Sequence, residues 1–284
     1  MSETPALPAN SCGRNAGARR RSSGHVLAVL ALVLVPLWLP LRAAAAAAPH
    51  WLLMVRTLNT DPTRTQEFND WYNNIDLPDV LAVPGFRQAL RAQAIAACGD
   101  SAAPCEAGER YVALYDIESA AIDKTIIDML MATWKMLRSG RDTSLLQVEE
   151  RVYYRRVAAD AAPETASVAD GQHFLLLERF DTQPQLSPAQ LQRLVRRQVQ
   201  ALGTLSAEVR SSRYELYRVL MFEPRTAPRY LTAYRFRVAS PEAAQRARDA
   251  LSTLAQQQRT QGYLQASAPL LYRELIEAAA DPPR

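Results

Sequence analysis

The chain contains one pattern of predicted strands twice. Residues 50–56 (HWLLMVR) return as residues 173–179 (HFLLLER), and residues 111–117 (YVALYDI) return as residues 230–236 (YLTAYRF). The order of the segments is the same in both halves of the chain. Because internal repetition of this kind indicates two copies of one folding unit, the sequence predicts an architecture that is built twice.

Residues 1–48 have a different character from the rest of the chain. A basic stretch over 14–21 precedes an apolar run over 26–41 and an alanine tract over 43–48. This three-part plan is typical of a secretory signal peptide, and prolines break the apolar run before it is long enough to span a bilayer comfortably. We therefore expect cleavage in the alanine tract and a periplasmic or secreted protein. An uncleaved anchor is the alternative, and it would be the only contact with a membrane.

The positive net charge of the full chain comes from this leader. The leader holds five arginines and one glutamate, so the remaining 28 basic and 28 acidic side chains balance. A basic stripe with interleaved aromatic residues, which nucleic-acid binding requires, is not found in the sequence. We therefore expect no nucleic-acid partner.

Two cysteines remain after the leader, Cys98 and Cys105, on either side of a short segment with glycine and proline. In an oxidising compartment this spacing predicts one small disulfide that pins the tip of a hairpin. A redox site would favour a Cys-x-x-Cys spacing, and a zinc site needs more ligands than the two histidines that follow the leader can add. We expect no metal site.

Residues 49–158 have the order β-α-β-β-α-β of a ferredoxin-like unit. Its strands are predicted over 50–57, 86–95, 111–117 and 145–157. Its first helix is predicted to be capped by Thr63 or Thr65 and to end at Leu77-Pro78, since the apolar residues Phe68, Trp71, Tyr72 and Ile75 follow helical spacing. The second helix is predicted over 122–137.

Residues 173–277 repeat this order after a linker over 159–172, and residues 278–284 form a tail. The repeat has predicted strands over 173–180, 213–222, 230–238 and 263–275, and predicted helices over 187–202 and 241–258. One such unit leaves one face of its sheet bare, and two units stacked sheet to sheet cover both faces. We therefore predict an α+β fold in which two tandem ferredoxin-like units close an intramolecular, pseudo-dimeric α/β barrel. It would be monomeric or dimerise further, and its interior would hold a small molecule.

Three segments of the first copy resemble a known superfamily. Residues 67–78 (EFNDWYNNIDLP), 83–86 (VPGF) and 110–115 (RYVALY) are similar to the dimeric α/β-barrel superfamily in its EthD-like branch. The resemblance covers the first copy well and the second copy only in its strands. It implies the barrel fold and a range of activities that includes cofactor-free monooxygenases, isomerases, cyclases and haem-handling proteins. The usual pattern has a histidine where this chain has Asp76, so histidine chemistry from this helix is not implied.

Asp76 and Tyr72 are the first candidates for catalysis. They are four residues apart and so share a helix face, and an aspartate near a helix C-terminus opposes the helix dipole. In a partly apolar cavity the pKa of Asp76 would rise, and Asp76 could act as general base or general acid with Tyr72 as hydrogen-bond partner. The alternative is a structural ion pair between Asp76 and a surface arginine such as Arg87.

His50 is the third candidate for proton transfer. Alternation along the strand places His50, Leu52, Met54 and Arg56 on one face, and histidines on the first strand line the barrel in cyclase-like relatives that this sequence resembles. The alternatives are a solvent-exposed strand end and a mobile terminus, because His50 lies close to the expected cleavage point.

The remaining candidates are predicted to bind substrate. Arg56 or Arg179 would hold an anionic group or a developing oxyanion, and Trp71 is weighed against a role in the core. The full set is Arg56, Trp71, Arg87, Tyr115, His173, Arg179 and Tyr234. The helix with Trp71 and Asp76 is not repeated in the second copy. We therefore expect one asymmetric site, built mainly by the first copy and walled by the second.

These residues favour an exported, cofactor-independent enzyme of the lyase, isomerase or monooxygenase type that acts on a small aromatic or polyketide-like molecule. The sequence has no phosphate-binding glycine loop and no nucleophile elbow. A non-catalytic periplasmic module that binds or senses a small molecule is the alternative. A haem protein with His173 or a tyrosine as axial ligand is a third, less favoured option.

Overall fold

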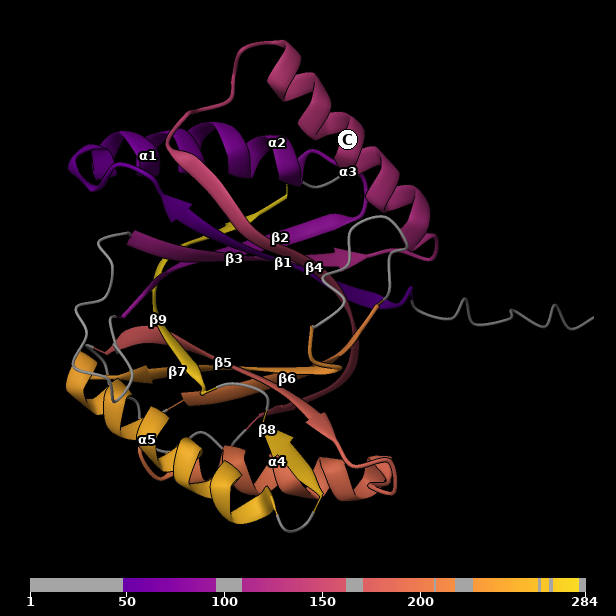
Figure 1. Ribbon diagram of the computed structural model, residues 1–284, viewed down its shortest axis with the longest axis vertical. Helices are drawn as coiled ribbons and strands as arrows, with labels where there is room; N and C mark the ends of the chain where they lie inside the picture. Colours follow the sequence, from indigo (N-terminus) through magenta and orange to yellow (C-terminus); the bar gives the residue numbers. More distant parts are fainter. Residues whose placement is uncertain are drawn as a thin grey trace, which may run out of the picture. The chain divides into compact units, whose positions relative to one another are not determined.

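The structure is a computed structural model that describes residues 48–95, 109–161, 171–206, 208–217, 227–259, 262–265 and 268–280 (Figure 1). The leader and both cysteines, Cys98 and Cys105, lie outside the described residues, so the signal peptide and the disulfide stay predictions. Among the helices of this described part, none is long and apolar enough to cross a membrane.

Both halves of the chain contain strands and helices in the order β-α-β-β-α-β. The elements of the first half are β1 (His50–Asn59), η1 (Pro62–Arg64), α1 (Thr65–Trp71), η2 (Tyr72–Asp76), α2 (Leu77–Leu81), β2 (Phe86–Ala94), β3 (Glu109–Glu118), α3 (Ile122–Arg138) and β4 (Leu146–Ala161). Those of the second half are β5 (Gln172–Thr182), α4 (Pro188–Gly203), β6 (Glu208–Leu216), β7 (Tyr230–Val238), α5 (Pro241–Gln258), β8 (Tyr263–Gln265) and β9 (Leu270–Ala279).

The first helical segment is longer than its sequence predicts. It begins at a 3-10 turn capped by the side chain of Asp61, and neither Thr63 nor Thr65 is the cap. It does not end at Leu77-Pro78, because Pro78 lies in the first turn of α2, where its missing N–H has no helical partner to lose. The helix ends at Leu81, and the turn into β2 contains Gly85, whose φ of +99° is a conformation that glycine adopts without strain.

Two strands of the second half also differ from their predicted bounds. β6 begins at Glu208 because its residues from Glu208 onward pair with β7. The predicted strand over 263–275 is two strands, because β8 pairs with the end of β5 at Phe180–Thr182 and β9 pairs with it at Phe174–Leu177. Between the two pairings this segment has four residues where β5 has two, so one continuous ladder is impossible.

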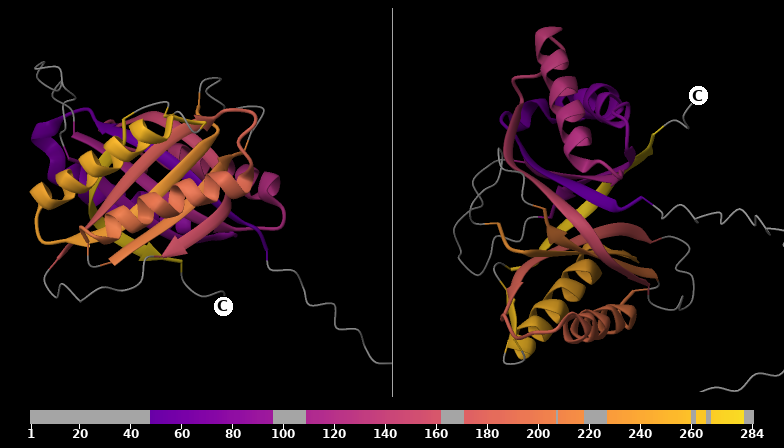
Figure 2. Two further views of the ribbon diagram at one scale, coloured as in Figure 1. Left: turned by 90° about the horizontal axis from the view of Figure 1, so that it is seen from below. Right: turned by 90° about the vertical axis from the view of Figure 1, so that its right-hand side faces the viewer.

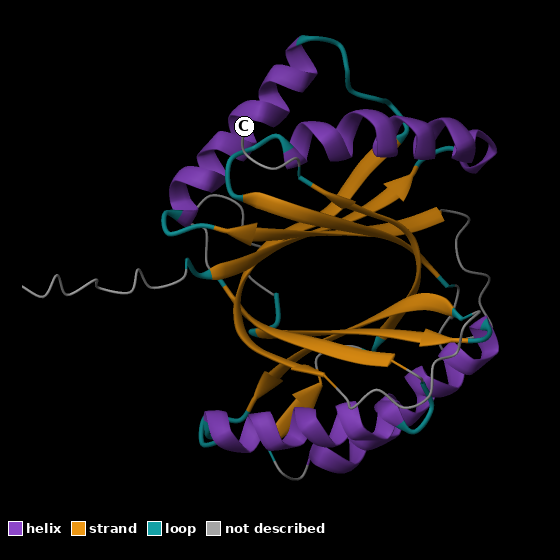
Figure 3. Ribbon diagram, turned by 180° about the vertical axis from the view of Figure 1, so that it is seen from behind, coloured by secondary structure: helices purple, strands orange, loops and turns teal. Residues whose placement is uncertain are grey.

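Eight of the strands form a closed antiparallel barrel. The first half contributes the order β4-β1-β3-β2 and the second half the order β9-β5-β7-β6. The halves join where β4 pairs with β6 and where β2 pairs with β9. β8 is a short addition at the end of β5. Helices α1, α2 and α3 cover the outside of the first four strands and α4 and α5 the outside of the other four (Figures 2 and 3).

Three apolar cores follow from the alternation of side chains along these strands. On β1, Leu53 and Val55 pack under α1, α2 and α3, while Leu52 and Met54 point into the barrel. A second core fills the space between β5, β7 and the helices α4 and α5. The barrel interior is packed with buried residues from both halves, and a hollow of about 200 Å³ remains toward one end. The expected pocket in the middle of the barrel is therefore mostly occupied by side chains.

Candidate functional site

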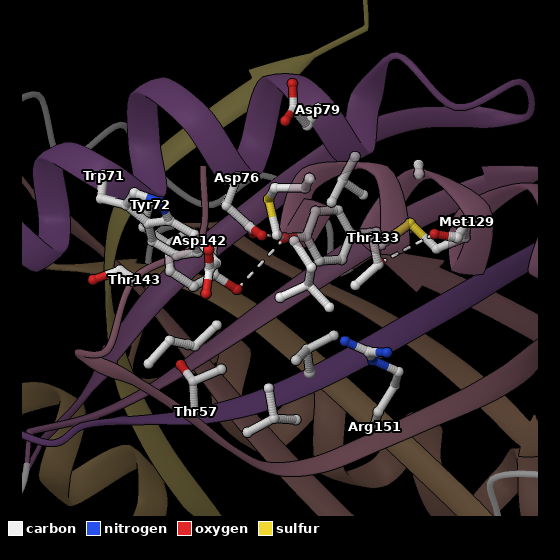
Figure 4. A pocket seen from close by; sticks show the side chains of 18 residues that line it. Thr57, Trp71, Tyr72, Asp76, Asp79, Met129, Thr133, Asp142, Thr143 and Arg151 are labelled. Atoms are coloured by element: carbon white, nitrogen blue, oxygen red, sulfur yellow. Dashed lines mark hydrogen bonds between the residues drawn. The ribbon is translucent and has the colours of Figure 1, made fainter. Parts of the chain in front are cut away.

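A cavity of about 320 Å³ lies between the outer face of the first sheet and the helices that cover it (Figure 4). Strands supply Val55, Thr57, Tyr115 and Arg151, the first helical segment supplies Trp71, Tyr72 and Asp76, and α3 supplies Met129, Thr133 and Met136. All residues that line it belong to the first half. The first copy therefore builds this cavity, and the second copy does not wall it.

Asp76, Tyr115 and Tyr72 form a chain of hydrogen bonds inside the cavity. The hydroxyl of Tyr115 donates to Oδ2 of Asp76 at 3.1 Å, and the hydroxyls of Tyr72 and Tyr115 are 3.5 Å apart. Burial raises the pKa of Asp76 to about 6, although the bond from Tyr115 opposes this rise. Burial also raises the pKa of both tyrosines, so both are neutral donors near pH 7.

A π turn places Tyr72 and Asp76 on the same side of their helix. The turn spans Tyr72–Asp76, and the N–H of Leu77 donates to the carbonyl of Tyr72, five residues earlier. Because a π turn takes more than four residues, side chains four apart stay almost in line. Such turns are frequent at functional sites, and here the turn directs the carboxylate into the cavity beside the tyrosines.

Arg91 supports this helix from the sheet. It is fully buried on β2, and its guanidinium donates to Oδ1 of Asn69 at 2.7 Å and to Oδ1 of Asn73 at 3.1 Å. The guanidinium also lies over the rings of Tyr72 and Tyr111, at 4.4 and 4.5 Å from their centroids. Arg91 therefore ties the helix and the tyrosine to the sheet.

A β-bulge shapes the side of the cavity that β4 forms. Arg56 pairs with Glu150 and Thr57 pairs with Val148, so Glu149 is an extra residue in β4. With the bulge, Val148 and Arg151, which are three residues apart, both line the cavity. Figure 4 shows the Arg151 side chain pointing from β4 toward the cavity.

Trp71, which the sequence indicates as a core or substrate-binding residue, belongs to the apolar core and also lines the cavity. It is buried, its indole N–H donates to the carbonyl of Arg141 at 2.7 Å, and the ring forms part of the cavity wall. Arg87, in contrast, lies at the surface and pairs with Glu118 at 3.3 Å. The ion pair considered for Asp76 and Arg87 is therefore not formed.

His50 and the arginines of the first strands lie on the other face of the sheet and do not line this cavity. His50 starts β1 on the face of Leu52, opposite to Leu53 and the helices. Arg56 and Arg179 both bind Glu150, at 3.3 Å and at 2.7 Å. Because Glu150 binds both guanidinium groups and Glu149 also lies 3.5 Å from Arg56, we leave both arginines out of the proposed site, together with His50.

The second half uses the equivalent space differently. Tyr234, the counterpart of Tyr115, donates to Oε1 of Gln198 at 2.8 Å and lies 3.2 Å from Oε2 of Glu178. All three side chains are fully buried between the sheet and α4. His173 is partly exposed, and its Nδ1 lies 3.7 Å from Glu274. Neither Tyr234 nor His173 reaches the cavity of the first half.

The cavity does not fit haem. Its lining includes no histidine and no cysteine, and both tyrosine hydroxyls that face it are buried, neutral and joined to each other or to Asp76. His173, considered from the sequence as an axial ligand, lies in the other half. In the described part of the chain, no group of three or more histidine, cysteine, aspartate or glutamate residues could hold a metal ion.

Two residues of the site, Arg91 and Arg151, were not predicted from the sequence. Both carried a signal, because each occupies a strand position that alternation assigns to the helix-covered face, with Ala89 and Tyr153 as neighbours on that face. A charged residue among buried neighbours marks a special contact. The bulge in β4 could not be read from the sequence.

Replacement of Tyr115 by phenylalanine tests the hydrogen bond to Asp76. The hydroxyl of Tyr115 stabilises the ionised carboxylate, so its loss is expected to raise the pKa of Asp76 further above about 6. A carbon NMR titration of the Asp76 carboxyl group measures this pKa. Tyr153→Phe, on β4, which is separated from β3 by β1, should leave it unchanged. An unshifted or lower pKa in Tyr115→Phe would show that the bond does not form.

Comparison with known proteins shows the fold. No model of a protein family and no curated protein matches the sequence. An anthrone oxidase-like protein of known structure is similar over 82% of this chain and 94% of its own, with 10% identity and a TM-score of 0.52. A putative monooxygenase from Fusobacterium nucleatum is similar over 82% of this chain and 95% of its own, with 8% identity and a TM-score of 0.48. A chlorite dismutase from Candidatus Nitrospira defluvii is similar over 81% of this chain and 92% of its own, with 9% identity and a TM-score of 0.47. At these identities the first likeness shows the fold alone: the chain has the dimeric α/β-barrel architecture, with an eight-stranded antiparallel barrel.

Proposed function

We propose that the cavity of the first half is the active site of a cofactor-independent enzyme of the lyase, isomerase or monooxygenase type. Asp76 would act as general base on a small aromatic or polyketide-like molecule. The observation that carries this proposal is a carboxylate that faces a mainly apolar cavity and whose pKa burial raises to about 6. A general base is most effective when its pKa lies near the pH at which it works.

The geometry around Asp76 suits removal of a proton. Among the described contacts, only Oδ2 of the carboxylate accepts a side-chain hydrogen bond, from Tyr115. The other oxygen, Oδ1, is left to take a proton from a ligand. Tyr115 fixes the orientation of the carboxylate, and Tyr72 fixes Tyr115 through the contact between their hydroxyls.

The proposed first step breaks an acidic C–H or O–H bond of the substrate. The proton goes to Asp76, and the electron pair stays on the substrate as an enolate or phenolate. Return of the proton to another carbon would complete an isomerisation, loss of a leaving group would complete an elimination, and attack on molecular oxygen would begin a monooxygenation. The apolar walls that Trp71, Met129 and Met136 form would reduce the contact of this anion with water.

We also propose that the chain is a tandem fusion of two ferredoxin-like units, that it belongs to the EthD-like branch, and that it is exported. The strand order of each half and the repeated segments of the sequence support the fusion. The helix with Trp71, Tyr72 and Asp76 supports the branch, and the leader supports export.

Deuterium exchange into an acidic C–H compound tests this function without knowledge of the full reaction. Anthrone is a suitable probe, because it is aromatic, flat and acidic at one carbon, and because the similar structure is named for its oxidation. We expect the protein to accelerate exchange of the anthrone methylene protons in heavy water, measured by proton NMR without oxygen. Binding of anthrone without faster exchange would instead favour the non-catalytic binding module.

A variant that fills the cavity provides the control for this assay. Ala132 lines the cavity from α3, so Ala132→Trp should block entry of the probe and abolish the acceleration. Exchange that persists in Ala132→Trp would place the reactive base elsewhere and refute the assignment of this cavity.

A further inference from the structure

We propose that the ligand of this cavity carries an anionic oxygen group, a carboxylate or a phenolate, and that Arg151 binds it. The inference deepens the proposed function, on which it rests in one respect: the same cavity must hold the substrate. It assigns a substrate class, a flat aromatic acid or phenol, and a residue that recognises the charge.

The first support is the position of Arg151. It pairs with Val55 of β1 in the middle of the sheet and lines the cavity together with Val55 and Thr57. Its surroundings on the sheet are mainly apolar. Arg151 is partly buried there, so an anionic partner would interact with it more strongly than in open water.

The second support is that no partner is present in the described part of the protein. Arg56, Arg91 and Arg179 each bind side-chain oxygens at 3.5 Å or less. Arg151 has no such bond within the described residues, and its Nε is buried without an acceptor. The donors of Arg151 are therefore available to a ligand.

The third support is the arrangement of charges around the cavity. Arg151 lowers the pKa of Asp76 by electrostatic attraction, yet the two groups form no ion pair among the described contacts. Of the other acidic residues that line the cavity, Asp79 pairs with Arg141 at 3.1 Å. Asp142 lies on the side of Tyr72 and Thr143, away from Arg151 in Figure 4. An anionic ligand can therefore approach Arg151 without displacing a carboxylate.

Together, Asp76 and Arg151 define two ends of a ligand. Asp76 on the helix side accepts the acidic proton, and Arg151 on the sheet side holds the negative oxygen. The planar guanidinium presents its N–H groups in a fork that matches a carboxylate or phenolate oxygen. The aromatic part would then lie between the two, against Trp71 and the methionines.

Two fluorescent dyes that differ by one charge test this inference. Anilinonaphthalene sulfonate and its uncharged parent, N-phenylnaphthylamine, share an aromatic skeleton, and both brighten in apolar pockets. In Arg151→Met, which keeps the apolar stem and removes the charge, the Kd of the sulfonate should rise roughly 10- to 100-fold, as expected for loss of a charged hydrogen bond. The Kd of the uncharged dye should change by less than about 3-fold.

Arg155→Met is the matched control. Arg155 lies four residues further along β4, is exposed, and pairs with Glu215. Its loss should therefore affect neither dye. Equal weakening of both dyes in Arg151→Met would show a structural role for Arg151 and overturn the proposal, as would unchanged binding of both. Sulfonate binding that survives in Ala132→Trp would place the dye outside the cavity and also overturn it.

The dye experiment tests the anion site separately from the proposed enzyme activity. Asp76→Asn removes a negative charge from the cavity, so it should bind the sulfonate as tightly as the wild type or more tightly. Selectivity for the sulfonate without catalysed exchange of anthrone would refute the enzyme and retain the anion site. Catalysed exchange without selectivity would retain the enzyme and refute the anion site.

Discussion

Replacement of Asp76 by asparagine is expected to slow the exchange of anthrone protons roughly 10²- to 10⁴-fold, the usual contribution of a positioned general base. Asparagine has almost the shape of aspartate and can still accept the hydrogen bond from Tyr115, but it cannot take a proton. The wild-type rate should rise with pH through about 6 and level off above it, because only the ionised carboxylate is active. The rates are measured by NMR at saturating and at low anthrone.

The same substitution is expected to stabilise the protein near pH 8. The pKa of the Asp76 carboxyl is about 6 in the folded protein, against an ordinary value of 3.8, so between these values the folded state binds more protons than the unfolded state. The stability of the wild type therefore falls as pH rises through this window. Asp76→Asn avoids this cost and should gain about 1–3 kcal/mol near pH 8 and almost nothing near pH 4. Urea denaturation at the two pH values measures the difference.

Asp79→Asn is the control for both measurements, since Asp79 also lines the cavity but pairs with Arg141. It should retain exchange activity and gain no stability at high pH. A less active and more stable Asp76→Asn would identify a residue that the fold keeps at a cost. Loss of activity with loss of stability would instead point to a structural carboxylate, and unchanged activity would refute the catalytic assignment.

The barrel could be predicted from the sequence because its determinants are local and repeated. Alternation in residues 50–56 and 173–179 assigns one face of each strand to the barrel and the other to the helices, and the cores follow this assignment. Helix ends were harder to predict. A proline usually ends a helix. Pro78 does not, because it follows a π turn and lies in the first turn of α2.

The location of the cavity could not be predicted, since it depends on volumes and not on patterns. A closed barrel of eight strands is just narrow enough for side chains to fill, and Leu52, Met54 and Tyr154 do so. In the first half the space under the helices contains the cavity. In the second half, Glu178, Gln198 and Tyr234 bond to one another there. The asymmetry was visible in the sequence through Tyr72 and Asp76, but its position on the outer face of the sheet was not.

Replacement of Arg91 by methionine is expected to destabilise the protein by about 2–4 kcal/mol. Methionine keeps much of the volume, but it leaves Oδ1 of Asn69 and of Asn73 without their charged donor, at about 1–3 kcal/mol each. The contacts with the rings of Tyr72 and Tyr111 contribute roughly 2 kcal/mol more. Part of this loss is offset, because burial disfavours the charged guanidinium and lowers the pKa of Arg91.

Arg87→Met isolates the effect of burial, since Arg87 is on the same strand, exposed, and paired with Glu118. This surface pair should contribute less than about 1 kcal/mol. Calorimetry should show a Tm lower by about 5–15 °C for Arg91→Met and nearly unchanged for Arg87→Met. Because Arg91 holds Tyr72 against the sheet, Arg91→Met should also lose the near-ultraviolet dichroism of the buried tyrosines while the barrel remains folded. Equal stability of the two variants would mean that relief of desolvation cancels every contact of Arg91, and the cavity would then be held in place by its apolar walls alone.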